Sequence, residues 1–128
     1  MTPIFLSLEQ VLRIHRSMIE RYGGEAGLRD AGLLHSAIAV PQASFGGEYL
    51  HADLFEMAAA YLYHIVQNHP FLDGNKRAGA AAAIIFLAMN DVPAQADEEG
   101  VAEITLRVAA GQAGKAEAAA FLRKMARQ

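Results

Sequence analysis

The stretch HPFLDGNKRAGAAAAIIFLAM, residues 69–89, joins a short polar turn to an alanine-rich segment. Residues 75–89 carry charge only at their start and are rich in alanine, so they predict a helix. Because the body of this helix is nearly uncharged, we expect it to be buried on most sides. The sequence therefore predicts an all-α fold, with about six to seven helices packed around one central helix.

The polar turn carries residue types that suit the handling of a nucleotide phosphate. Gly74 permits a sharp turn, and the free N–H groups of a helix start bind anions. Lys76 supplies a mobile point charge, and Arg77 can contact two phosphate oxygens at once. Asp73 can share Mg²⁺ with a phosphate, and His69 can accept a proton from a hydroxyl group. This order of groups predicts a phosphoryl- or nucleotidyl-transfer site.

The same residues also have plain structural interpretations. His69 could cap the preceding helix, and Asp73 could form an Asx-turn or an N-cap. Lys76 and Arg77 could be a solvated first turn, but cations at a helix start oppose the dipole, so two together favour a bound anion. Asn75 could be only the N-cap, or could both cap the helix and contact phosphate.

Capping and breaking residues divide the rest of the chain into elements. Ser7 and Gln10 form a capping-box pattern that predicts a helix to about residue 21. Asp30 predicts the cap of a short helix over residues 31–40, which Pro41 closes. Further helices are expected over residues 53–67, 97–110 and 115–127, and residues 42–52 are expected to form an ordered loop or a small hairpin.

Composition narrows the class of protein. The chain has 128 residues, of which 53% are hydrophobic, so we expect a single domain over residues 1–128 with its own core. It has no cysteine, which excludes a disulfide framework, cysteine-ligated zinc and a thiol nucleophile and fits a cytoplasmic location. The net charge of −3 disfavours nucleic acid as a partner. No signal peptide or membrane-spanning stretch is evident, so no membrane partner is expected.

Residues 69–77 resemble the signature of the Fic/Doc family, H-x-F-x-[DE]-G-N-[GK]-R, and are most similar to the death-on-curing (Doc) toxin branch. Further similar segments lie at residues 21–24, 27–30, 41–49, 53–56 and 86–90. The resemblance extends over roughly the first ninety residues and is weaker in the tail. It implies a Fic/Doc-type helical bundle with a possible tiny β-hairpin flap.

Three positions bear on the reaction that the resemblance implies. Family members that transfer AMP usually carry glycine after the asparagine and a second arginine three positions after the first, where this chain has Lys76 and Ala80. Doc toxins are similar to this chain at both positions and phosphorylate their target, with the nucleotide bound in reverse. Gly74, in contrast, is similar to the AMP-transferring members, because Doc-type kinases often have alanine there.

The resemblance implies a toxin of a toxin–antitoxin pair that uses ATP and Mg²⁺ to phosphorylate a hydroxyl side chain on a target protein such as translation elongation factor Tu. His69 would be the general base and Asp73 the metal ligand. The phosphates would lie against Gly74, Asn75, Lys76 and Arg77. The alternatives are a nucleotidyltransferase that transfers AMP or UMP and a catalytically silent interaction module. The presence of His69, Asp73 and Asn75 together argues against a silent module.

Other parts of the chain carry further predictions. Residues 44–49 are either a plain surface loop or, by the resemblance, a flap that aligns the target by backbone pairing. No inhibitory motif of the form [ST]-x-x-x-[EA]-G-N is found elsewhere, so we expect a separate antitoxin protein. It would fold a segment against the groove between the motif and the first helix, near Arg13, Arg16 and Glu20. The remaining histidines are interpreted as surface or core-edge residues: His15, His35, His51 and His64.

Overall fold

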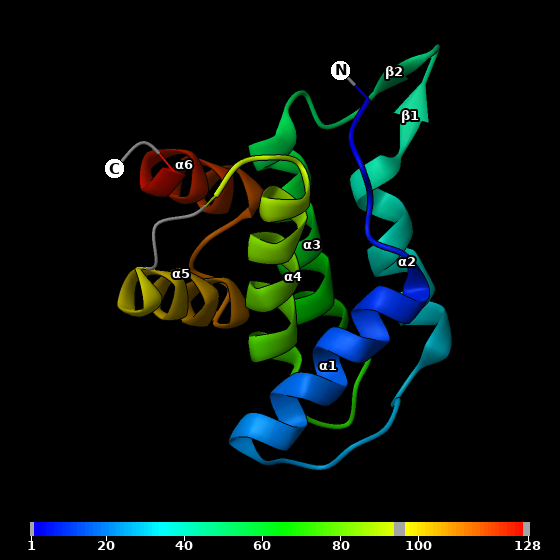
Figure 1. Cartoon of the computed structure of the whole chain (residues 1–128), viewed down its shortest axis with the longest axis vertical. Coiled ribbons are helices and arrows are strands. Elements are labelled where there is room, and N and C mark those ends of the chain that lie inside the picture. The colour runs from blue at the N-terminus through cyan, green and yellow to red at the C-terminus, as the bar shows by residue number, and fades with distance from the viewer. Residues whose placement is uncertain (1, 94–96, 127–128) are drawn as a thin grey trace.

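The computed structural model describes residues 2–93 and 97–126, and over these residues the chain forms six α-helices, one 3-10 helix and one two-stranded antiparallel sheet (Figure 1). The elements in chain order are α1 (Leu8–Tyr22), α2 (Ala31–Ala39), η1 (Val40–Gln42), β1 (Ser44–Phe45), β2 (Glu48–Tyr49), α3 (Leu54–Asn68), α4 (Asn75–Met89), α5 (Glu98–Ala109) and α6 (Lys115–Ala126). The predicted all-α fold is confirmed. None of the helices described is long and apolar enough to cross a membrane.

Side-chain caps begin four of the helices at the predicted residues. Ser7 accepts a hydrogen bond from the Gln10 N–H, and the Gln10 side chain accepts one from the Ser7 N–H, which completes the capping box of α1. Asp30, Asp53 and Asp97 each accept a bond from the N–H three residues later, at the starts of α2, α3 and α5. These contacts confirm the predicted helix starts.

The helix predicted over residues 31–40 ends at Ala39, and Val40 opens a 3-10 turn with Pro41 near its start. Proline is tolerated there because the first N–H groups of a helical turn have no partner within it. The last helix was predicted to residue 127, which lies outside the described residues.

Helices α3 and α4 lie side by side at the centre of the molecule, with α1 on one side and α5 and α6 on another (Figure 1). Small side chains let the two central helices approach closely. A Cβ atom on Gly79 would lie 2.9 Å from Val66 Cγ2 and 3.1 Å from the Leu62 carbonyl oxygen. Both helices also carry fully buried alanines, namely Ala58, Ala59 and Ala60 of α3 and Ala78, Ala82 and Ala83 of α4. The predicted central, buried helix is therefore confirmed.

The hairpin formed by β1 and β2 lies near the C-terminal end of α4 (Figure 1). The Tyr49 ring meets the Phe5 ring edge-on at 5.5 Å between centroids, and Phe5 stacks on Phe86 at 5.8 Å. Phe86 follows Asn75 by eleven residues, which is about 16 Å along a helix. The predicted hairpin is thus confirmed, but it lies at the opposite end of α4 from the polar turn.

Candidate active site

The polar turn connects the C-terminus of α3 to the N-terminus of α4. His69 is the C-cap of α3, and its backbone is left-handed, with φ 52° and ψ 53°. Its N–H donates to the Ile65 carbonyl oxygen at 3.2 Å. The imidazole is exposed and lines a cleft at the start of α4. The backbone of His69 therefore caps the helix while its side chain is free for chemistry.

Asn75 does not cap α4, and that part of the prediction is wrong. Gly74 is the N-cap, with φ 78° and ψ 15°. The Asn75 side chain turns back into the loop, where Oδ1 accepts from the Phe71 N–H at 2.9 Å and Nδ2 donates to the Phe71 carbonyl at 3.0 Å. Asn75 is 3% exposed, so this amide is committed to the turn. Its backbone N–H, at the helix start, is the group suited to an anion.

His15 of α1 packs against the polar turn, a role that the sequence did not reveal. Its imidazole stacks on the ring of Phe71, and its Nε2 lies 2.8 Å from the Asp73 carbonyl oxygen. Nε2 must be the donor because a carbonyl oxygen only accepts. The interpretation of His15 as a surface or core-edge residue was wrong, since it is 5% exposed. The contact joins residues 58 positions apart, so no local pattern signals it.

The loop between α1 and α2 runs beside the polar turn. Leu28 forms an antiparallel bridge with Phe71, the Leu72 N–H donates to the Gly27 carbonyl at 3.0 Å, and the Arg29 N–H donates to the Pro70 carbonyl at 2.7 Å. The backbone next to the motif is therefore this loop and not the β1–β2 hairpin. The placement of the hairpin contradicts the interpretation of residues 44–49 as a flap at the site.

Asp73 presents an ionised carboxylate at the mouth of the site. Its Oδ1 accepts from the Gly74 N–H at 2.8 Å, and its Oδ2 accepts from the Glu25 N–H at 3.2 Å. These bonds, first that from Gly74 and then that from Glu25, lower the pKa of Asp73, and the charge of Arg77 lowers it further. Neither the Asx-turn nor the N-cap predicted for Asp73 is formed, because its carboxylate accepts from the N–H of the very next residue and Gly74 is the N-cap of α4. The exposed carboxylate still has lone pairs for a cation.

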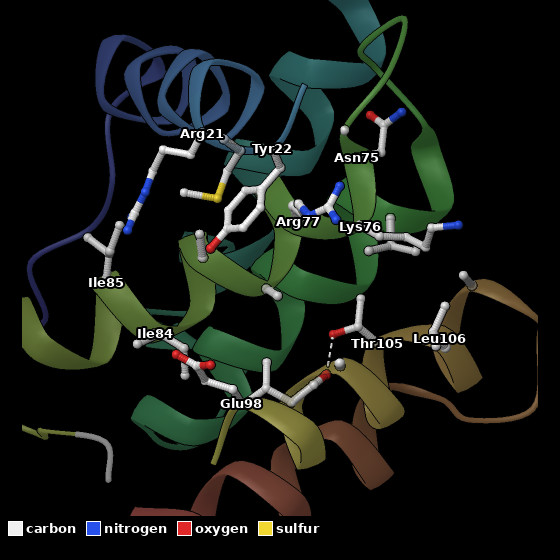
Figure 2. A pocket seen from close by; sticks show the side chains of 18 of the residues that line it. Arg21, Tyr22, Asn75, Lys76, Arg77, Ile84, Ile85, Glu98, Thr105 and Leu106 are labelled. Carbon is white, nitrogen blue, oxygen red and sulfur yellow. Dashed lines mark hydrogen bonds between the residues drawn. The ribbon is translucent and has the colours of Figure 1, made fainter. Parts of the chain in front are cut away.

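The two cations of the motif project from the first turn of α4. Lys76 and Arg77 are both exposed. The guanidinium of Arg77 lies over the ring of Tyr22 with its carbon 4.6 Å from the ring centroid, and that of Arg21 lies 5.8 Å from the same centroid. Figure 2 shows Tyr22 reaching from α1 to Arg77. This cation–π contact orients Arg77 without neutralising its charge.

The polar turn opens into a cleft of about 990 Å³ between α1, α4 and α5. The residues predicted for the site all line it: His69, Asp73, Gly74, Asn75, Lys76 and Arg77. Ala80, about one turn of α4 beyond Arg77, lines it as well. On the facing side, α5 contributes Glu98, Thr105 and Leu106 (Figure 2). The Thr105 hydroxyl donates to the Val101 carbonyl at 2.7 Å and is therefore occupied.

The face of α1 that lines the cleft differs from the predicted one. Met18, Arg21 and Tyr22 line the cleft, whereas the predicted Arg13, Arg16 and Glu20 do not. The difference follows from helical periodicity, because residues 18, 21 and 22 share one face of a helix.

A family model matches the chain over residues 5–87, and its description is the Fic/DOC family. "Protein kinase doc" of Escherichia phage P1 is 34% identical over 120 residues, which are 94% of each chain. "Toxin Doc" of Mycolicibacterium smegmatis is 46% identical over 76 residues, which are 59% of this chain and 58% of that protein. The segment that the family model matches, residues 5–87, contains the polar turn and most of α4. With the motif, the helical fold and these relatives in agreement, the chain belongs to the Fic/DOC family, in its Doc branch.

Proposed function

We propose that this chain is the toxin of a toxin–antitoxin pair and that it transfers the terminal phosphoryl group of ATP to a hydroxyl side chain on a target protein. The observation that carries the proposal is the grouping of His69, Asp73, Lys76 and Arg77 on one wall of a single cleft. The printed names of the two relatives, a protein kinase and a toxin, support it. By family resemblance the target is translation elongation factor Tu.

The residues of the turn fit Mg²⁺ bound together with ATP. Asp73 is exposed and its pKa is lowered, so the carboxylate is ionised as a Mg²⁺ ligand must be. Among residues 2–93 and 97–126 no cluster of three acidic or histidine side chains offers a complete protein cage. Mg²⁺ commonly uses one or two carboxylates together with phosphate oxygens and water, so a single aspartate suffices. The ion would neutralise phosphate charge beside Lys76.

His69 is the general base of the proposed reaction. Its imidazole takes the proton of the target hydroxyl while the hydroxyl oxygen bonds to the terminal phosphorus and the bond from that phosphorus to ADP breaks. Lys76, Arg77 and the N–H groups at the start of α4 hold the phosphate oxygens as negative charge shifts towards ADP. Because Gly74 is the left-handed N-cap, α4 begins at the next residue, and its first N–H groups therefore lie where the turn ends.

Nucleotidyl transfer is the second candidate. Ala80 lines the cleft and carries no charge, so the clamp of a second motif arginine is missing, which favours phosphorylation. Gly74 favours the alternative, because by family resemblance AMP-transferring members carry glycine at this position, whereas Doc-type kinases often carry alanine.

Intact-mass analysis separates the two reactions. The purified chain is incubated with ATP, Mg²⁺ and elongation factor Tu, and the masses of both proteins are recorded. We expect a gain of one phosphate on the target, and a nucleotide adduct would replace the kinase proposal with nucleotidyl transfer. His69→Ala should abolish transfer while ATP binding stays largely intact, because the base acts on the target hydroxyl. Full transfer by this variant would contradict the role of His69.

A further inference from the structure

The backbone of His69 adopts a conformation that a residue with a Cβ atom rarely takes. Among the described non-glycine residues, positive φ occurs at His69 and Asp91. Left-handed backbone brings Cβ close to the carbonyl oxygen, so neighbouring contacts must hold it in place. At His69 this conformation ends α3 and sends the chain into the polar turn, with the imidazole on the cleft wall.

Arg29 supplies such contacts from the loop between α1 and α2. Its Nε donates to the His69 carbonyl oxygen at 2.6 Å, and one terminal nitrogen donates to the Asn68 carbonyl oxygen at 2.8 Å. Carbonyls at the end of a helix lack intrahelical donors and lie at the negative end of the helix dipole, so a forked cation suits them. The contact joins positions 40 residues apart.

We propose that Arg29 is a positioning residue for the transfer reaction, which holds His69 in its left-handed conformation and so keeps the imidazole directed at the target hydroxyl. The inference rests on the proposed function of His69. Arg29 does not line the cleft, so it acts through His69 and not on the nucleotide.

The role of Arg29 is separable from the folding of the turn. Its side chain is exposed and lies outside the apolar core. The turn has other supports that do not involve this side chain, namely the bonds from Asn75 to Phe71, from His15 to Asp73 and from Leu72 to Gly27. Removal of the guanidinium therefore frees the two carbonyls at residues 68 and 69 while the rest of the turn stays tied.

The test compares Arg29→Ala and Arg29→Lys with wild type and with Arg13→Ala, a matched control on the exposed face of α1 outside the cleft. We expect Arg29→Ala to lower kcat on the order of tenfold, because small misplacements of a catalytic group are costly. The KM for ATP and the melting temperature should stay close to those of the control. Arg29→Lys keeps the charge but not the fork, so an intermediate kcat is expected.

A double-mutant cycle and a spectroscopic measurement complete the test. In the His69→Ala background, Arg29→Ala should leave any remaining trace of transfer unchanged, because the group that it positions is gone. The ¹³Cα and ¹³Cβ shifts of His69 should lose their left-handed signature in Arg29→Ala alone. Wild-type kcat in Arg29→Ala, or an equal loss in both backgrounds, would overturn the inference. If wild type transfers nothing, the proposed function fails separately, and unchanged His69 shifts in Arg29→Ala would overturn the positioning claim by themselves.

Discussion

The imidazole of His15 lies flat on the ring of Phe71, with the ring centroids 3.7 Å apart and the planes 3° from parallel. The same imidazole donates to the Asp73 carbonyl oxygen, two residues further along the turn. Through this one side chain, helix α1 therefore contacts the turn by ring stacking and by a hydrogen bond. Because Asp73 is the proposed metal ligand, this support bears on Mg²⁺ use as well as on stability.

Two substitutions at His15 separate these contributions. His15→Phe keeps a flat ring on Phe71 but removes the donor to Asp73, and His15→Gln keeps a donor but removes the ring. We expect His15→Phe to raise the Mg²⁺ concentration needed for half-maximal transfer, with a loss of about 1 kcal/mol in unfolding free energy. His15→Gln should lose stacking of about 0.5–1.5 kcal/mol and additional buried ring area, and change the Mg²⁺ requirement less. Urea unfolding measures the loss of stability, and titration of the transfer rate with Mg²⁺ measures the Mg²⁺ requirement. A larger rise in Mg²⁺ requirement in His15→Gln than in His15→Phe would contradict the role of the hydrogen bond to Asp73.

Tyr22 offers a second matched pair because it contacts Arg77 through its ring. Tyr22→Phe keeps the ring and should leave the KM for ATP near the wild-type value. Tyr22→Leu removes a cation–π contact of about 0.5–1 kcal/mol at an exposed site, which corresponds to a KM for ATP about two- to fivefold higher. Steady-state kinetics at varied ATP decide the matter. An equal rise in the KM for ATP in both variants would show that the hydroxyl, and not the ring, is the important group. An unchanged KM in both would show that Tyr22 does not contribute to ATP binding.

The sequence predicted the fold well where the signals are local. The bounds of α4 agree with the prediction, and Ser7, Asp30, Asp53 and Asp97 begin helices as expected, because a cap depends on residues only three positions apart. The residues of the polar turn were also found together, since they are contiguous. Their roles in transfer stay predictions.

What the sequence could not give depends on contacts between distant segments. The support of Phe71 by His15 requires α1 to lie under the turn, and the position of the hairpin requires the packing of Tyr49 on Phe5. The prediction of Asn75 as a cap was wrong because its buried side chain bonds to the Phe71 backbone instead. There the amide oxygen accepts a hydrogen bond and the amide nitrogen donates one.

A histidine–lysine cluster at the contact between α3 and α6 predicts acid sensitivity. Lys115 Nζ lies 3.1 Å from His64 Nε2 and 3.5 Å from His51 Nε2. Burial, then the charge of Lys115 and then His51 lower the pKa of His64 from its usual 6.5 to about 4. Burial and Lys115 also lower the pKa of His51, against the opposing charge of Glu56.

The sign of the pH effect follows from these shifts. The unfolded chain binds a proton at His64 at a higher pH than the folded chain does, so folding stability is fully present above pH 6.5 and is lost as the pH falls towards about 4. Urea unfolding at pH 7 and pH 5 should show this loss, and Lys115→Gln should reduce it because one cause of the shift is removed. His35→Gln, at an exposed position of α2, is the control. A loss that is unchanged in Lys115→Gln would contradict the role of the cluster.

The cleft also predicts where an antitoxin binds. Leu106 of α5 is 56% exposed and Ile85 of α4 is 38% exposed, and both line the cleft beside the polar turn. A disordered segment that folds along this cleft would cover these apolar side chains and close off the turn. Because Arg13 does not line the cleft, we now expect the antitoxin on the surface that Met18 and Tyr22 share with α4 and α5.

Co-expression with the neighbouring open reading frames tests this surface. One of them should restore growth and co-purify with the wild-type chain. Leu106→Glu places a charge in the apolar part of the cleft and leaves every residue of the turn unchanged, so it should remain toxic and escape rescue. Arg13→Glu changes charge outside the cleft and should be rescued like wild type. Full rescue of Leu106→Glu would show that the antitoxin binds to another surface. Failure of every neighbouring frame to restore growth would remove the main support for a toxin–antitoxin pair, and a solitary Fic-type modifying enzyme would then be the better account.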